Sequence, residues 1–372
     1  MQNEAYIQRT YKKFEKALEL YAAHIFRTVE TAENVLSYET QAHLRKPPKA
    51  SEMIPIFPGT TWGKEYGNIW LRTTFSVPET LAGQQLCVIP DVHAVEILCF
   101  KNEIPAGIIN SKNDFLGGNH SAMFLQEAAV PGTEIDVALE CYAGHDCPGT
   151  QPYDRYDREE SDPEEFIHKY EGIRLCVLDK VFRDFAFDAA TVLQLANLPE
   201  DNFTRVKAHN CLMKAFPYLI QDIHQASIEE LRDSAEIMSR ILAPALEKGS
   251  GDRSRGKLML VGHSHMDTAW LWPVEETIRK CARTYSQALT LMDLYPEYTF
   301  IQSSVLHLDW MREYYPDIFE GIKKRVAEGR YEPNGGFWVE CDCNITGGES
   351  MLRQFLYGQR YTMEHLNYRA DS

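Results

Sequence analysis

The last third of the chain alternates between predicted strands and predicted helices, and this order limits the folds open to it. The predicted strands span residues 257–262, 298–303 and 330–339, and the helices that follow them span residues 275–295, 306–329 and 349–366. Such alternation predicts a parallel sheet covered by helices, either an open sheet or a barrel. In these folds, functional side chains gather where the carboxyl ends of the strands meet.

A different pattern precedes this region. Residues 6–25 have helical spacing, and from about residue 62 the pattern changes to short β-rich segments separated by Gly, Pro and Asn. These segments predict an antiparallel β-sandwich. Its strands are expected at residues 69–77, 85–90, 95–100, 135–141 and 173–178. Residues 186–247 have helical patterns throughout.

Chain length and one segment of linker composition indicate where domains divide. At 372 residues the chain is long for a single core. Residues 249–256 read GSGDRSRG, which is typical of a linker. We therefore predict a β-sandwich domain with a leading helix at residues 1–185, a helical connector and linker at 186–256, and the first β/α units of a larger domain at 257–372.

Charge and hydropathy exclude several classes of partner. The formal net charge of −16 argues against nucleic acid and anionic membranes, because both require a basic surface. No apolar run approaches the roughly 20 residues of a membrane helix. The N-terminus lacks a signal-peptide pattern, and the nine cysteines lie in surroundings typical of reduced core thiols. We expect a cytoplasmic protein.

The segment VGHSHMDTAWLWP follows the first predicted strand and carries His263, His265 and Asp267 at alternate positions. In an extended chain these three side chains lie on one face. Imidazole and carboxylate groups are ligands that zinc and similar divalent cations accept. The segment therefore predicts a metal site, in which His263 is either a third ligand or a supporting residue. Its two tryptophans are flat apolar surfaces of the kind on which sugar rings stack.

The segment NGGFWVECDCN follows the third predicted strand, and its Glu340 and Asp342 share one parity. The two adjacent glycines permit a close backbone approach or a positive φ. Cys341 and Cys343 have the opposite parity, so we predict that they pack and do not share a metal with Asp342.

The alternative role for Asp342 is to cap the following helix. Asn344, Thr346 and Glu349 are better candidates for that cap, which leaves Asp342 free to act in a site.

Together, these two segments resemble the α-mannosidases of glycoside hydrolase family 38. The similarity lies in VGHSHMDTAWLWP, in EPNGGFWVECDCN about seventy residues later, and in GESMLRQFLYGQR, and it is strongest over residues 257–366. In organisation, the chain is similar to the cytosolic and bacterial branch, which has an extra N-terminal β domain. The resemblance implies a zinc-dependent retaining glycosidase with a seven-stranded β/α barrel, acting on mannose-containing oligosaccharides.

The resemblance also implies roles for individual residues. His265 and Asp267 match the family's first two metal ligands. Asp342 matches the carboxylate that both contacts the zinc and acts as nucleophile. Trp270 matches an aromatic side chain that lines the sugar subsite, and His263 matches a position not usually counted as a ligand.

The chain departs from the family pattern in length and at one position. Cys341 stands where related sequences often have proline. A closed barrel needs about 200 to 250 residues, whereas about 115 follow residue 257 here. The resemblance places the general acid and the last histidine ligand beyond Ser372. We therefore expect an N-terminal fragment that alone lacks mannosidase activity and binds zinc weakly, with homo-oligomer formation through the β domain left open.

Two other functions stay open. His263 and His265 at a strand end also resemble the amidohydrolase pattern, in which both histidines bind metal and later strand ends supply a lysine or further histidines. A non-catalytic carbohydrate-binding protein would instead need exposed aromatic side chains on the sandwich, where Trp62 and Trp70 are the only tryptophans.

Overall fold

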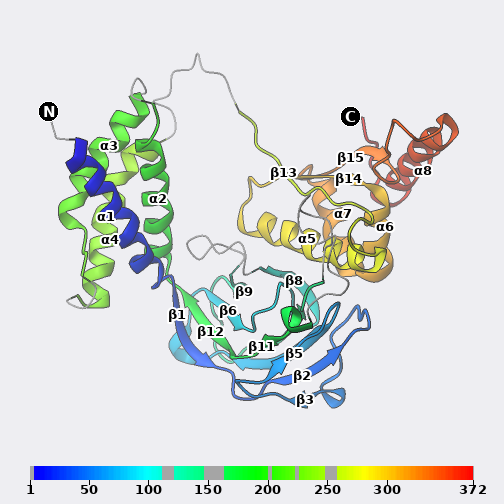
Figure 1. Ribbon diagram of the computed structural model, residues 1–372, viewed down its shortest axis with the longest axis horizontal. Coiled ribbons are helices and arrows are strands. Elements are labelled where there is room, and N and C mark those ends of the chain that lie inside the picture. Colours follow the sequence, from blue (N-terminus) through cyan, green and yellow to red (C-terminus); the bar gives the residue numbers. More distant parts are fainter. Residues whose placement is uncertain are drawn as a thin grey trace.

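The N-terminal strands pair in two antiparallel sheets, as predicted, in a computed structural model of the chain (Figure 1). The structure describes residues 4–110, 121–145, 163–199, 203–222, 226–247 and 258–371. One sheet has the order β1 (Phe26–Thr31), β12 (Gly172–Leu178), β6 (Leu86–Asp91) and β9 (Met123–Gln126). The other has the order β3 (Ile54–Pro55), β2 (Leu36–Thr40), β5 (Asn68–Ser76), β10 (Glu134–Tyr142), β7 (Glu96–Lys101) and β8 (Ile104–Ile109). A short pair joins β4 (Thr61–Trp62) to β11 (His168–Lys169).

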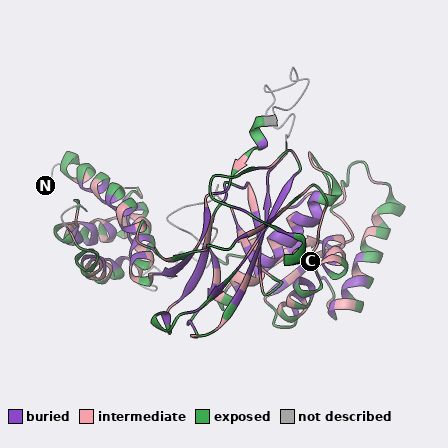
Figure 2. Cartoon of the chain, turned by 90° about the horizontal axis from the view of Figure 1, so that it is seen from below, coloured by how far each residue is buried: buried purple, intermediate pink, exposed green. Residues whose placement is uncertain are grey.

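The central strands β5, β10 and β7 of the six-stranded sheet are covered on both faces, which explains why most of their residues are buried. Leu71 and Val137 point into the sandwich core that the two sheets share. Trp70 and Phe100, on the outer face, belong to a second core that includes the C-terminal helices. In Figure 2, buried residues run along the strands at the centre of the view. Trp62 and Trp70 are only 3% and 1% exposed, so neither offers the exposed surface that a carbohydrate-binding sandwich would need.

Four helices pack together beside the sandwich (Figure 1). They are α1 (Glu4–Ala22), α2 (Lys180–Ala196), α3 (Phe203–Ala215) and α4 (Ile228–Leu246). The predicted domain division places α1 with the sandwich. In the structure, however, Tyr21 of α1 packs edge-on against Phe185 of α2 and forms a hydrogen bond with Ser234 of α4. The core side chains of α1 thus pack with the helical connector. The predicted linker at residues 249–256 lies outside the described residues.

The C-terminal region has the predicted parallel sheet. Its strands are β13 (Gly262–His263), β14 (Phe300–Ser304) and β15 (Tyr331–Phe337), in that order. The helices are α5 (Val274–Leu294), α6 (Val305–Tyr314), α7 (Pro316–Ala327) and α8 (Gly348–Leu366). The described residues form three strands of a parallel sheet, and the predicted seven-stranded barrel is not confirmed. No helix in the described parts of the chain is long and apolar enough to cross a membrane.

The first strand of this sheet is shorter than predicted, and the apolar residues that precede it are exposed. Only Gly262 and His263 pair with β14, and Leu258 and Met259 before them are 83% and 92% exposed. A continuous apolar run becomes a buried strand only where neighbours cover its edges and both faces. In the described residues, β13 has a neighbour on one side alone.

The predicted helix over residues 306–329 is also wrong, because two helices occupy this stretch. Proline has no N–H group, and its ring clashes with the preceding turn of a helix. Pro316 therefore begins a new helix, and Tyr315 before it adopts φ −137° and ψ 65°, outside the helical region. Gly329 follows the second helix with a φ of 72°, as expected of a glycine that ends a helix.

A bulge interrupts the pairing of β14 with β15 at the carboxyl edge of the sheet. Gln302 pairs with Pro333 and Ser304 with Phe337, so β15 has two extra residues at this point. The predicted Gly335–Gly336 pair supplies them, with φ values of 76° and 61°. Such bulges redirect the strand that contains them. Helix α8 contacts the bulge closely, since a Cβ atom on Gly358 would lie 2.0 Å from the Gly336 carbonyl oxygen.

This contact predicts that Gly358→Ala lowers the free energy of unfolding. Alanine in place of glycine ordinarily stabilises a helix interior by about 1 kcal/mol. Here the added methyl group overlaps backbone, and overpacking of this kind costs about 1–3 kcal/mol. Urea unfolding measures the change. Gly348→Ala is the matched control, because Gly348 is in the same helix and has open space around its Cβ position. Equal or higher stability of both variants would contradict the close approach.

Candidate functional site

His265 lies between two carboxylates at the carboxyl edge of the parallel sheet. Its Nε2 atom is 3.2 Å from Oδ1 of Asp267, and its Nδ1 atom is 3.3 Å from Oε2 of Glu340. Glu340 also accepts a hydrogen bond from the Ser303 hydroxyl. The group therefore joins the segments after β13 and β15 to the end of β14, where the sequence predicts a shared site.

The His265–Asp267 pair fits two ligands of one zinc ion. Ligand atoms about 2.0–2.1 Å from a tetrahedral zinc are about 3.3 Å apart, close to the 3.2 Å between these two side chains. Nitrogen and oxygen donors together suit a borderline-soft cation. Across the described ranges, however, no group of three His, Cys, Asp or Glu side chains is arranged to hold a metal ion. Asp342, the third predicted ligand, does not complete the set.

Asp342 instead begins the turn that leads into α8. Its Oδ1 atom accepts the N–H of Asn344 at 3.3 Å, and its carbonyl accepts the N–H groups of Ile345 and Thr346. The predicted caps of α8 are wrong, since its N-cap is Gly347, which has no side chain to offer. The carboxylate of Asp342 is exposed, as a site residue would require.

The two cysteines beside Asp342 differ from each other. Cys341 is partly buried, with its Sγ atom 3.4 Å from the sulfur of Met351. Cys343 is exposed, so its prediction as a packing residue is wrong. The alternation on which that prediction depends stops where β15 ends, at Phe337. Six other cysteines in the described residues are buried free thiols, as predicted.

The two tryptophans of the first motif have different surroundings. Trp270 is 61% exposed and meets Trp272 edge-to-face. Trp272 donates a hydrogen bond to the Thr277 hydroxyl, and the Lys280 ammonium lies 4.8 Å from its ring centre. Trp272 is therefore held by α5, whereas the Trp270 ring remains open to solvent. The role of Trp270 in sugar binding stays a prediction.

His263 contacts the neighbouring strand. Its Nδ1 atom lies 3.2 Å from the Ile301 carbonyl oxygen of β14, an arrangement suited to N–H donation. This contact agrees with a supporting role. It is equally compatible with metal binding through Nε2, as the amidohydrolase alternative requires, so it does not separate the two interpretations.

The loop after Asp267 is anchored by residues that sequence reasoning missed. Thr277 donates to the Thr268 carbonyl at 2.7 Å, and the Thr268 hydroxyl lies 3.2 Å from Nε2 of His307. Nδ1 of His307 lies 3.2 Å from the Tyr285 hydroxyl. Burial lowers the pKa of His307 to about 4, so this ring is neutral at pH 7. The one sequence signal that could have identified His307 is its position at the start of the helix that follows β14.

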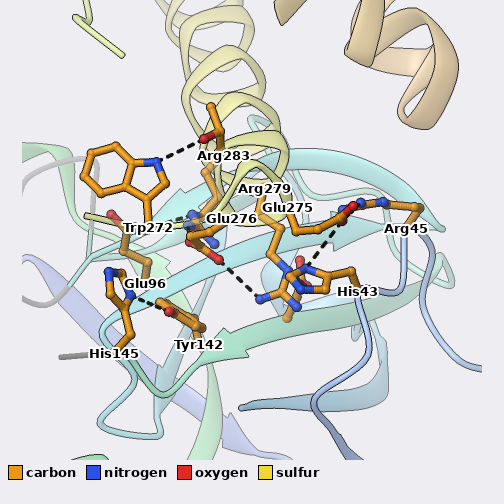
Figure 3. A network of polar contacts seen from close by, with 12 residues as sticks. His43, Arg45, Glu96, Tyr142, His145, Trp272, Glu275, Glu276, Arg279 and Arg283 are labelled. Carbon is orange, nitrogen blue, oxygen red and sulfur yellow. Dashed lines mark hydrogen bonds and ion pairs between the residues drawn. The ribbon is translucent and has the colours of Figure 1, made fainter. Parts of the chain in front are cut away.

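Buried ion pairs join α5 to the outer face of the six-stranded sheet (Figure 3). Glu276 contacts Arg279 at 3.3 Å and also Arg283. Arg283 reaches Glu96 of β7 at 2.8 Å, and Arg279 lies 3.4 Å from Glu140 of β10. Burial raises the pKa of Glu140, and the two arginines oppose that rise. Helix α5 begins directly after the segment VGHSHMDTAWLWP. The ion pairs therefore hold the end of this segment in a fixed position relative to the sandwich.

A cavity of about 280 Å³ opens beside the site, lined by Ser303, Asn334, Gly335, Phe337, Glu340, Cys341 and Cys343. A larger cavity of about 540 Å³ lies between the β8–β9 region and helices α5 and α7. Neither cavity is lined by a predicted site residue. The smaller cavity is adjacent to the site because Glu340, which contacts His265, lines it.

The ion-pair network predicts that Arg279→Ala strongly destabilises the fold. Its removal leaves Glu140 buried without its nearest cation, a change that typically costs about 3–5 kcal/mol. Urea unfolding followed by tryptophan fluorescence measures the loss. Arg240→Ala, which breaks an exposed i,i+4 pair with Glu236, should cost less than about 0.5 kcal/mol. Similar small effects of both changes would contradict a structural role for the network.

The buried His307 predicts a loss of stability in acid. A base whose pKa falls from 6.5 to about 4 on folding stabilises the protein above pH 6.5. That contribution, roughly 3 kcal/mol, is lost as the pH falls from 6.5 to 4. In urea unfolding across this range, the difference between the unmodified chain and His307→Gln should therefore shrink with acidity. A difference that stays constant between pH 6.5 and 4 would contradict the assignment.

Known proteins are similar in sequence to the region of the chain that contains the candidate site. Residues 255–372 match the glycosyl hydrolases family 38 N-terminal domain. The chain is 47% identical over 108 residues to alpha-mannosidase G of Dictyostelium discoideum, covering 29% of this chain and 10% of that protein. It is 44% identical over 114 residues to alpha-mannosidase 2C1 of Homo sapiens, covering 31% and 11%.

One relative extends the similarity to the N-terminal region. Alpha-mannosidase 2C1 of Mus musculus is 27% identical over 316 residues, which cover 83% of this chain and 28% of that protein. The chain thus spans between a tenth and just over a quarter of the length of these relatives. Residues 255–372 belong to the glycosyl hydrolase family 38 N-terminal domain, and most of the chain is homologous to alpha-mannosidases.

Proposed function

We propose that this chain serves glycoside hydrolysis, as part of a retaining α-mannosidase that acts on the terminal mannose of oligosaccharides. The observation that carries the proposal is the His265–Asp267 pair at the sheet edge, within a segment that matches the family 38 domain. The relatives that share this segment are named alpha-mannosidases. The seven-stranded barrel, the cytoplasmic location and the cytosolic branch of the family belong to the same proposal.

We place Zn²⁺, or a similar divalent cation, on His265, Asp267 and Asp342. The separation of the first two side chains supports their part in this assignment. Asp342 lies outside the pair in this structure, and its inclusion depends on the sequence motif alone. When bound, the metal would act as a Lewis acid toward the 2- and 3-hydroxyls of mannose, which form a cis diol.

Asp342 is the proposed nucleophile. Its carboxylate attacks the anomeric carbon, the bond from that carbon to the leaving oxygen breaks, and a second carboxyl group protonates the leaving oxygen. Water then hydrolyses the glycosyl ester and restores the carboxylate. Trp270, with its open ring, would form an apolar wall beside the sugar.

The nucleophile assignment can be tested with a reagent that needs no general acid. Fluoride leaves without protonation, so 5-fluoro-α-mannosyl fluoride should form a stable ester on the zinc-loaded chain. We expect peptide mass spectrometry to find one fluoromannosyl group on Asp342, and none in Asp342→Asn or after chelation of the metal. Aryl α-mannosides should give no sustained turnover, because the chain lacks an assigned general acid.

Two controls make the outcome specific. The corresponding glucosyl reagent, whose 2-hydroxyl is equatorial, should not label the chain, and Asp309→Asn should label normally. Ester formation on another carboxylate, or none under conditions where zinc is bound, would contradict the role of Asp342. Robust turnover of an aryl mannoside would contradict the expected inactivity of this chain.

A further inference from the structure

Glu340 contacts His265 at the ring nitrogen that does not face Asp267. The Nδ1–Oε2 distance is 3.3 Å, whereas Asp267 lies 3.2 Å from Nε2. A neutral imidazole has one N–H group and one lone pair, and the partner of one nitrogen determines the role of the other. The ring can therefore donate to only one of these carboxylates when it is neutral.

Glu340 is itself held by two adjacent serines of β14. The Ser303 hydroxyl donates to its Oε1 atom, and its own backbone N–H donates to the Ser304 hydroxyl at 3.3 Å. Ser304 is 1% exposed, so this anchor is part of the packed sheet. Both carboxylate oxygens of Glu340 thus have protein partners, one from Ser303 and one from His265.

Asp267 differs in this respect. In the part of the chain that the structure describes, its only side-chain hydrogen bond or ion pair is the one to His265, through Oδ1. Its side chain is also 41% exposed. Of the two carboxylates beside His265, Asp267 is therefore the one with an oxygen still available to a cation.

We infer that Glu340 is a positioning residue that accepts the Nδ1–H of His265 and leaves the Nε2 lone pair directed toward the Asp267 side. The inference rests on the proposed metal site, and it assigns no metal contact to Glu340. Metal-binding histidines normally donate their second ring N–H to a carboxylate, a carbonyl or water, which fixes the tautomer and the ring orientation. The contacts Ser303–Glu340–His265 supply such a support from strand β14 and the segment after β15.

The tautomer of His265 tests the inference directly in the metal-free chain. Histidine labelled with ¹⁵N distinguishes the two ring nitrogens, and the neutral from the protonated ring, by NMR across a pH series, and His265→Gln assigns the signals. We expect the Nδ1–H tautomer in the unmodified chain and in Glu340→Gln, whose amide oxygen can still accept. In Glu340→Ala the population should shift toward Nε2–H. An unmodified chain with Nε2–H, or an unchanged tautomer in Glu340→Ala, would overturn the proposal.

Zinc affinity provides the second measurement, by competition with a chromophoric chelator. Glu340→Ala should weaken binding about 10–100-fold, as losses of such orienting partners typically do, and Glu340→Gln should weaken it less. Glu320→Ala, at an exposed carboxylate of α7 paired with Lys323, is the matched control and should bind normally. Equal losses for Ala and Gln would mean that Glu340 binds the metal itself, and the proposal would be wrong.

The two proposals fail separately. If the unmodified chain binds no zinc, the proposed metal site fails, and the tautomer measurement still decides the role of Glu340. If zinc binds normally to Glu340→Ala, only the positioning role fails.

Discussion

The packing of α5 on the outer face of the six-stranded sheet is the contact on which the C-terminal region depends. Ile278 and Tyr285 of α5 share one core with Trp70 and Phe100 of the sheet, and the same core continues into α6, α7 and the parallel strands. Each large apolar side chain buried there contributes about 1.5–3 kcal/mol. This apolar area offsets the cost of burying the Arg279–Glu140 pair, since buried ion pairs contribute little net stability of their own. The charges instead define one orientation of the helix on the sheet.

The orientation of α5 determines where the site begins. Thr277, in the second turn of α5, bonds to both the Thr268 carbonyl and the Trp272 indole. The loop between Asp267 and α5 is therefore held by the helix that the sandwich anchors. In this way the N-terminal domain supports the candidate site, and none of its described residues is among the contacts of His265. The similarity to the mouse relative extends over 83% of this chain, so it includes residues of the sandwich as well.

The elements that could be predicted from the sequence were those with strong local signals. The five predicted sandwich strands and the order of strands and helices after residue 257 are present, because alternating apolar side chains and turn residues act within a few positions. The edge strand β1 was missed, since most of its residues are exposed and polar. The exposure of Leu258 and Met259 could not be predicted either, because burial depends on which other elements of the fold pack against that strand.

Sequence alternation also fails to predict that Glu340 and Asp342 lie apart. The two residues are two positions apart in the sequence, but their side chains have different neighbours. Alternation holds only within a strand, and β15 ends at Phe337. Beyond that point Glu340 is attached to the serines of β14, whereas Asp342 turns into the loop before α8. His265 and Glu340 thus contact each other in this structure, whereas Asp342 bonds within its own turn. Recruitment of Asp342 to the proposed metal site would break the hydrogen bonds of an exposed turn and leave the buried strand ends unchanged.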